Sequence, residues 1–196
     1  MARIPKQPLK IKERLKSYER ALRREVKLYG AIDDSGGLRY ELGVLYLLLG
    51  DVKGALKSYK WMQKLAPDDM GEPFDHLCWT LALYRSGDME AASTKLCQTM
   101  LLNLYLIPFL IGVEQEPFNI WHGTNWAEKD YINYAPSEIF ALWDGAAIDW
   151  ARQIYQSPEF RAVRDRYILL SEQLQSERPG PKRSQIVQEL YQLKAG

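Results

Sequence analysis

Residues 37–69 read GLRYELGVLYLLLGDVKGALKSYKWMQKLAPDD, and this stretch decides the fold. Apolar residues recur in it at helical spacing, first before and then after Gly50-Asp51: Leu42, Leu45, Tyr46 and Leu49, then Val52, Ala55, Leu56, Tyr59 and Met62. Steps of three and four residues place such a set on one face of a helix. Ser35 and Asp51 are candidate caps for the two helices, and Pro67 ends the second. The stretch therefore predicts two amphipathic helices joined by a tight turn.

The small and aromatic residues of this hairpin follow an order typical of one repeat family: Leu42-Gly43, Tyr46, Gly50-Asp51, Ala55, Tyr59 and Pro67. The order resembles the tetratricopeptide (TPR) repeat, a helix–turn–helix of roughly 34 residues. Gly43 and Ala55 are small where two helices would cross closely. Arg39 departs from the family, which usually has an aromatic residue at that place. The resemblance implies an interaction module, and it does not identify the partner.

Residues 73–100 read as a second and more diverged copy of the hairpin. Gly87-Asp88 repeats the turn of Gly50-Asp51, and Ala92 stands at the same offset as Ala55. The small and aromatic positions of the first helix are not repeated. We expect the two copies, within residues 36–102, to form antiparallel hairpins with both alanines buried where the helices cross.

In a TPR array the first helix of each pair lines a concave face. Here that face is expected to carry mostly apolar partner-binding residues: Tyr40, Val44, Leu47, Phe74, Leu81, Tyr84 and Arg85. TPR proteins that clamp a terminal carboxylate line this face with Lys, Arg and Asn, and only Arg85 has that character. An open apolar groove would be a liability. Either a hydrophobic segment of a partner fills it, or part of the chain's own residues 104–126 does, and we predict the second.

Residues 103–135 form an aromatic, irregular insert. Its beginning, NLYLIPFLIG from Asn103 to Gly112, resembles a segment that follows the repeats in some bacterial TPR proteins and in the suppressor-of-tumorigenicity-seven family, and this resemblance extends to about Trp150. Within the insert, FNIWHGTNW has the composition of a recognition surface, because Trp is favoured at interface hot spots. Its candidate partner-binding residues are Trp121, His122, Asn125 and Trp126. Alternatively, the two tryptophans fill the groove from within.

Residues 1–30 carry ten Lys or Arg against three Glu, a formal charge of +7, whereas the rest of the chain carries −6. A helix over residues 9–29 is predicted from one apolar stripe: Ile11, Leu15, Tyr18, Leu22, Val26 and Tyr29. Its other faces are basic. The helix either caps the first repeat with its charges in solvent, or it binds nucleic acid or membrane through residues 10–27.

The C-terminal third predicts more helix. In residues 136–176 we expect a helical hairpin, its first helix running from Pro136 through Gly145 to Ile154 and its second following Ser157. Residues 177–196 hold a polar linker with two prolines and then a short helix from about Ser184. That helix is either a docked cap or a detachable tail.

The sequence contains little that suggests chemistry. His76 and His122 are its only histidines, and neither has metal-ligand spacing, although a catalytic pairing of His122 with a carboxylate stays open. The cysteines, Cys78 and Cys97, suit a reducing cytoplasm. We find no signal peptide and no apolar run of membrane-spanning length. We expect an all-α fold of about seven helices stacked as TPR-like hairpins. The expected function is non-catalytic binding of a protein or peptide partner, without cofactor or metal, and the alternative is binding of an anionic surface by the first helix.

Overall fold

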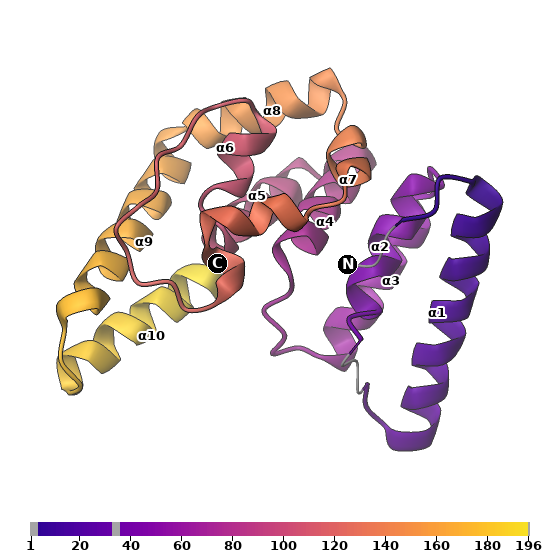
Figure 1. The fold of residues 1–196 in the computed structure, drawn as a ribbon, viewed down its shortest axis with the longest axis horizontal. Coiled ribbons are helices and arrows are strands. Elements are labelled where there is room, and N and C mark those ends of the chain that lie inside the picture. The colour runs from indigo at the N-terminus through magenta and orange to yellow at the C-terminus, as the bar shows by residue number, and fades with distance from the viewer. Residues whose placement is uncertain (1–3, 33–35, 196) are drawn as a thin grey trace. The chain divides into compact units, whose positions relative to one another are not determined.

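The computed structural model describes residues 4–32 and 36–195, which form helices and no strand. The helices, seen in Figure 1, are α1 (Pro8–Tyr29), α2 (Arg39–Leu48), α3 (Val52–Leu65), α4 (Pro73–Ser86), α5 (Met89–Leu102), α6 (Leu106–Leu110), η1 (Asn125–Ala127), η2 (Lys129–Tyr134), α7 (Ser137–Ala141), α8 (Gly145–Gln156), α9 (Pro158–Ser176) and α10 (Pro181–Ala195). The expected all-α class is confirmed. The structure has more helices than the seven or so expected, partly because α6 and α7 are too short for the spacing of their apolar residues to reveal a helix. Ser35, expected to cap the first repeat, lies outside the described residues.

Contacts divide the chain into two compact units. Unit 1 comprises Met1–Ala92 and Tyr134–Trp143, and unit 2 comprises Ser93–Asn133 and Asp144–Gly196. The boundary falls within α5. The antiparallel pairing of α4 with α5, and the packing of residues 104–126 on the concave face, therefore remain predictions.

The turn between α2 and α3, in unit 1, has the local chemistry expected of it. Gly50 has a φ of 74°, a left-handed conformation that costs glycine nothing. Asp51 is the N-cap of α3, as predicted, and its Oδ1 accepts a hydrogen bond from the Gly54 N–H at 2.8 Å. That bond satisfies one of the backbone donors left without a partner in the first turn of a helix.

The crossing of α2 and α3 is close because two small residues permit it. A Cβ atom added at Gly43 would lie 2.0 Å from the Cζ of Tyr59, and Ala55 is fully buried, as expected. The Tyr59 ring also stacks on Trp79 of α4, with 4.8 Å between the ring centroids. Its hydroxyl donates to the backbone carbonyl of Asp75 at 3.3 Å. Tyr59 thus links α2, α3 and α4.

Helix α1 packs its apolar stripe against α2. The core formed there joins the stripe to α2: Ile11, Leu15, Leu22, Leu42 and Leu45. Tyr29 was expected in the stripe but is 75% exposed, because the chain leaves the helix at Gly30, whose φ is 71°. The apolar part of α1 therefore has the packing expected of a cap.

The second copy repeats the turn chemistry of the first. Gly87 has a φ of 84°, and the Asp88 Oδ1 accepts from the Ala91 N–H at 3.2 Å, as Asp51 does for α3. Ala92 is fully buried, as predicted. The sequence-predicted helices therefore form at both ends of this turn.

One expected helix is broken. The pattern from Pro136 to Ile154 predicts a single helix with Gly145 inside it, but the structure has α7 and α8 separated by Leu142–Asp144. Asp144 is the N-cap of α8, and its Oδ1 accepts from the Ala147 N–H at 3.0 Å. The carboxylate thus starts a new helix where the apolar spacing alone predicted continuation, and Gly145 is the first residue of that helix.

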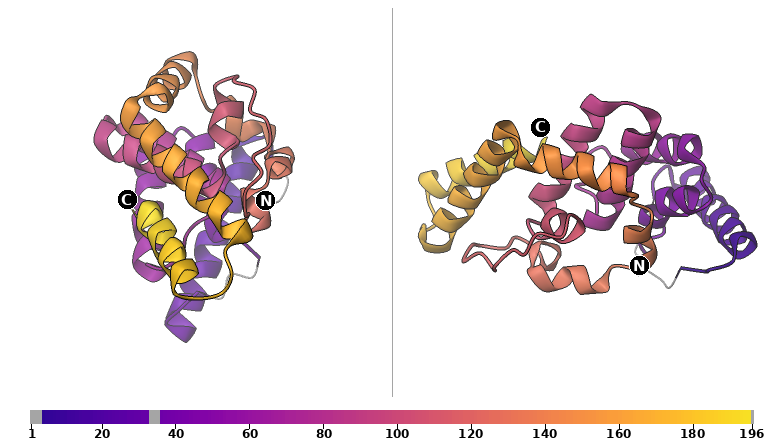
Figure 2. Two further views of the ribbon diagram at one scale, coloured as in Figure 1. Left: turned by 90° about the vertical axis from the view of Figure 1, so that its left-hand side faces the viewer. Right: turned by 90° about the horizontal axis from the view of Figure 1, so that it is seen from above.

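In unit 2, α10 packs along α9, and both Figure 1 and Figure 2 show the two helices side by side. It begins at Pro181, earlier than the expected Ser184, because proline is tolerated in the first turn of a helix. Ile186 and Leu190 are buried. An ion pair joins Arg166 to Glu189 at 2.6 Å. The C-terminal helix is therefore docked.

Candidate interaction surfaces

The apolar residues expected to line an open groove lie in the core. Val44, Leu47, Phe74 and Leu81 are all at most 2% exposed. A partner cannot reach them in this conformation, so the expected partner-binding role of these four residues is corrected to a packing role. Helical periodicity showed which faces are apolar, but it does not show what covers them.

The rim residues of the expected groove take part in contacts within unit 1. The Tyr40 hydroxyl accepts from Arg39 at 2.8 Å and donates to the Asp69 carboxylate at 3.0 Å. Burial is the main reason why the pKa of Tyr40 is raised to about 12. Arg85 is exposed, and its guanidinium donates to the backbone carbonyl of Leu142, the C-cap of α7, at 2.5 Å. Tyr84 is half-buried. Arg85 thus fixes the end of a short helix.

The aromatic insert, of which residues 103–133 belong to unit 2, is anchored by a buried asparagine. The Asn103 Nδ2 donates to the carbonyls of Trp126 and Glu128 at 2.7 and 3.1 Å, while its Oδ1 accepts from the Tyr105 N–H at 2.9 Å. In the middle of the insert, the Trp121 N–H donates to the Ser171 carbonyl of α9 at 3.1 Å. Backbone groups of the insert therefore make the hydrogen bonds that hold it in place, and several of its side chains are exposed.

The four predicted recognition residues of the insert differ in exposure. Trp121 is 43% exposed and Asn125 is exposed, whereas His122 and Trp126 are half-buried. Trp126 lies against Tyr131, with ring centroids 6.4 Å apart. Of the two tryptophans, Trp121 offers the larger surface to a partner.

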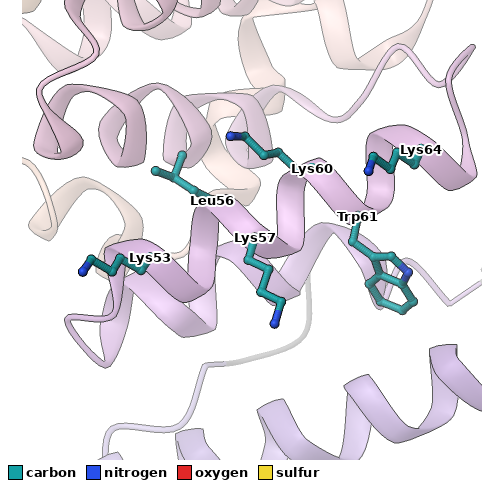
Figure 3. Close-up of a pocket in the computed structure, with 6 residues that line it drawn as sticks. All are labelled: Lys53, Leu56, Lys57, Lys60, Trp61 and Lys64. Carbon is teal, nitrogen blue, oxygen red and sulfur yellow. The ribbon is translucent and has the colours of Figure 1, made fainter.

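The surface that the sequence analysis did not single out is the outer face of α3. A shallow depression of about 480 Å³ is lined there by cationic and apolar side chains: Lys53, Leu56, Lys57, Lys60, Trp61 and Lys64. Figure 3 shows Lys57 and Trp61 towards one side of the helix and Leu56 and Lys60 towards the other. The four lysines are exposed, and Leu56 and Trp61 are half-buried. Their regular spacing was visible in residues 52–65, but a lysine row is the ordinary composition of a solvated helix face.

One basic residue of α1 adjoins this surface. The Arg23 guanidinium lies over the Trp61 ring, 4.9 Å from its centroid, a favourable cation–π arrangement. Other cations of α1 are exposed: Lys10, Lys12, Lys16, Arg20, Arg24 and Lys27. We call the lining of the α3 depression together with Arg23 the α3 face.

Burial lowers the reactivity of the two cysteine thiols. Cys78 and Cys97 are free thiols, and burial raises the pKa of Cys97 to about 11 and that of Cys78 well above its ordinary value. Since the thiolate is the reactive form, neither suits nucleophilic chemistry. Within residues 4–32 and 36–195, no three His, Cys, Asp or Glu side chains gather as metal ligands would. Nor does that part of the chain contain a helix with the length and apolarity needed to cross a membrane.

Comparisons of the chain with protein-family models, with curated proteins and with solved structures give no match.

Proposed function

We propose that this chain is a non-catalytic, TPR-type protein-interaction module that acts as an adaptor. The observation that carries the proposal is the α3 face, where a row of exposed lysines lies between half-buried Leu56 and Trp61 at a depression of about 480 Å³. A partly covered tryptophan is favoured at protein interfaces, and accessible charged side chains beside it add electrostatic complementarity to a partner. The free cysteines suit a reducing compartment, so the proposal includes a cytoplasmic location.

Support for the TPR-type hairpin comes from side-chain sizes. Gly43 and Ala55 stand where α2 and α3 cross, and Tyr59 fills the space beside Gly43. The turn at Gly50-Asp51 has the left-handed glycine and the capping carboxylate that such a hairpin needs. A repeat of this kind supplies a rigid scaffold and brings no chemistry of its own.

A second candidate function is the binding of an anionic surface, nucleic acid or membrane, through α1. The observation that favours it is the exposure of the cations of α1 over its whole length, from Lys10 to Lys27. Such binding falls steeply as the salt concentration rises, because counterions are released from the phosphates.

The experiment is affinity capture with the tagged full chain from a lysate of the source organism, followed by reconstitution with the purified partner. Parallel samples are treated with nuclease and with detergent, and the tag alone serves as the control. We expect a protein that stays bound after both treatments and forms a stoichiometric complex when purified. Capture that disappears with nuclease or detergent would replace this proposal with the second candidate.

A further inference from the structure

The α3 face has a defined arrangement of charge and apolar surface. At 100° per residue, its four lysines fall within a sector of about 60° and extend about 16 Å along the helix. At the same angle per residue, Leu56 falls to one side of this row and Trp61 to the other, and Figure 3 shows these two side chains on opposite sides of the helix. The face is therefore a cationic row with an apolar margin on each side, and lysine side chains add their own apolar stems to the margins.

Within residues 4–32 and 36–195, no carboxylate neutralises this row. Among the ion pairs of the described residues, none involves Lys53, Lys57, Lys60 or Lys64. Nearby carboxylates are used elsewhere: that of Asp51 caps α3, and that of Glu19 accepts from the Tyr46 hydroxyl at 2.5 Å. The uncompensated charge favours an anionic ligand.

Two anionic ligands fit this face poorly. Single-stranded nucleic acid is usually held by bases stacked on aromatic rings, but Arg23 already covers one face of the Trp61 ring. A phosphate backbone also has nothing to place against Leu56. A membrane-surface helix buries its apolar face in lipid, whereas the most apolar side of α3, with Ala55 and Tyr59, is buried in the protein.

We infer that the α3 face binds an acidic amphipathic segment of a partner protein, whose carboxylates meet the lysine row while its apolar side chains cover Leu56 and Trp61. An acidic helix repeats its carboxylates every three or four residues, as the lysines do, so both patterns can match over several turns. This inference rests on the proposed interaction function, whose partner it describes chemically.

The test measures the affinity of the full chain for a labelled helical peptide of about 16 residues that carries Glu at the spacing of the lysines and Leu beside them. The variant Lys57→Glu/Lys60→Glu reverses the centre of the row, and Leu56→Gln removes one apolar margin without changing the charge. The matched control, Lys129→Glu/Arg178→Glu, makes the same change of charge at exposed residues of unit 2. Circular dichroism verifies that every variant is folded.

We expect the double lysine variant to bind the peptide at least about tenfold more weakly, Leu56→Gln to weaken it by about threefold, and the control to be unchanged. A peptide with Gln in place of Glu should not bind. Equal affinity of the wild type and the Lys57→Glu/Lys60→Glu variant would overturn the inference. The inference would also be overturned if the wild type bound poly-uridylate or phosphatidylserine vesicles more tightly than the acidic peptide and the Lys57→Glu/Lys60→Glu variant abolished that binding.

The same variant separates this inference from the proposed function. If a reconstituted partner binds the wild type and the Lys57→Glu/Lys60→Glu variant equally well, the interaction function stands and the α3 face is not its site. If no protein partner survives nuclease and detergent, the proposed function itself fails.

Discussion

Gly43 is the residue at which the smallest change should have a large effect on the hairpin. In Gly43→Ala the new methyl group would overlap the buried Tyr59 ring, whose displacement would disturb its stacking on Trp79 and its hydrogen bond to the Asp75 carbonyl. We expect the free energy of unfolding to fall by about 1–3 kcal/mol, the usual cost of overpacking a core. Urea denaturation measures it.

The matched control for Gly43 is Gly145→Ala, at the start of α8. A Cβ added there meets no atom within 4 Å, and the backbone is not left-handed. We expect this variant to be as stable as the wild type or slightly more stable, because alanine restricts the unfolded chain. If both alanine variants had the same stability, the close crossing of α2 and α3 would be refuted.

Two tyrosines should make stability depend on alkaline pH. The pKa values of Tyr40 and Tyr46 are raised to about 12, mainly by burial, and for Tyr46 also by its hydrogen bond to Glu19. In the unfolded chain both titrate near 10. Between pH 10 and about 12 the folded state therefore holds protons that the unfolded state has lost, so stability is complete below pH 10 and falls as the pH rises through this window.

The measurement is the urea midpoint as a function of pH for the wild type and for Tyr46→Phe. The variant lacks one of the titrating hydroxyls, so its midpoint should decline less over the alkaline window. Parallel curves for the two proteins would show that Tyr46 has an ordinary pKa in the folded state.

At the scale of a single element, α3 depends on its cap. Asp51→Ala removes the acceptor for the Gly54 N–H and should destabilise the protein by about 1 kcal/mol. Asp51→Asn keeps a side-chain oxygen at the same place and should cost much less. A loss as large in the Asn variant as in the Ala variant would attribute the effect to charge and not to capping.

The docking of α10 should depend on apolar burial more than on its ion pair. Ile186 and Leu190 are buried, so Ala at either position should cost about 2 kcal/mol and open the linker at residues 177–180 to protease. Arg166 is exposed and Glu189 is partly exposed, so water and salt screen the pair. We therefore expect Glu189→Gln to leave the proteolysis rate nearly unchanged. Faster cleavage of Glu189→Gln than of Leu190→Ala would reverse this ranking.

Elements that depend on local chemistry could be predicted from the sequence. The turn at Gly50-Asp51 was predictable because a left-handed glycine and a capping carboxylate are needed whatever surrounds them. The break at Asp144 was not, since an aspartate within an apolar period looks the same whether it caps a new helix or faces solvent. The burial of Val44 and Leu81 was not predictable either, because periodicity shows which face is apolar and not what covers it.

The candidate site shows a similar division. The basic character of α1 could be predicted from composition, whereas the sequence left open whether Trp121 is exposed or buried. The α3 face could not, because it depends on Arg23 of α1 reaching the Trp61 ring of α3, a contact between distant parts of the sequence. Without that contact, the lysines of α3 are an ordinary solvated row.

For the whole molecule, chain connectivity predicts how the two units unfold. The chain passes between them three times, after Ala92, Asn133 and Trp143. The first passage lies inside α5, a continuous helix from Met89 to Leu102. Because helix formation is cooperative, neither unit can lose its part of α5 without fraying the other part. We therefore expect one thermal transition whose calorimetric and van't Hoff enthalpies agree.

Calorimetry of the full chain tests this coupling, with an insertion of two glycines after Ala92 as the comparison. Glycine is a poor helix former, so the insertion should interrupt α5 and let each unit unfold at its own temperature. The van't Hoff enthalpy of the inserted variant should then fall below its calorimetric enthalpy, or two peaks should separate. Two resolved transitions in the wild type would show that α5 does not couple the units.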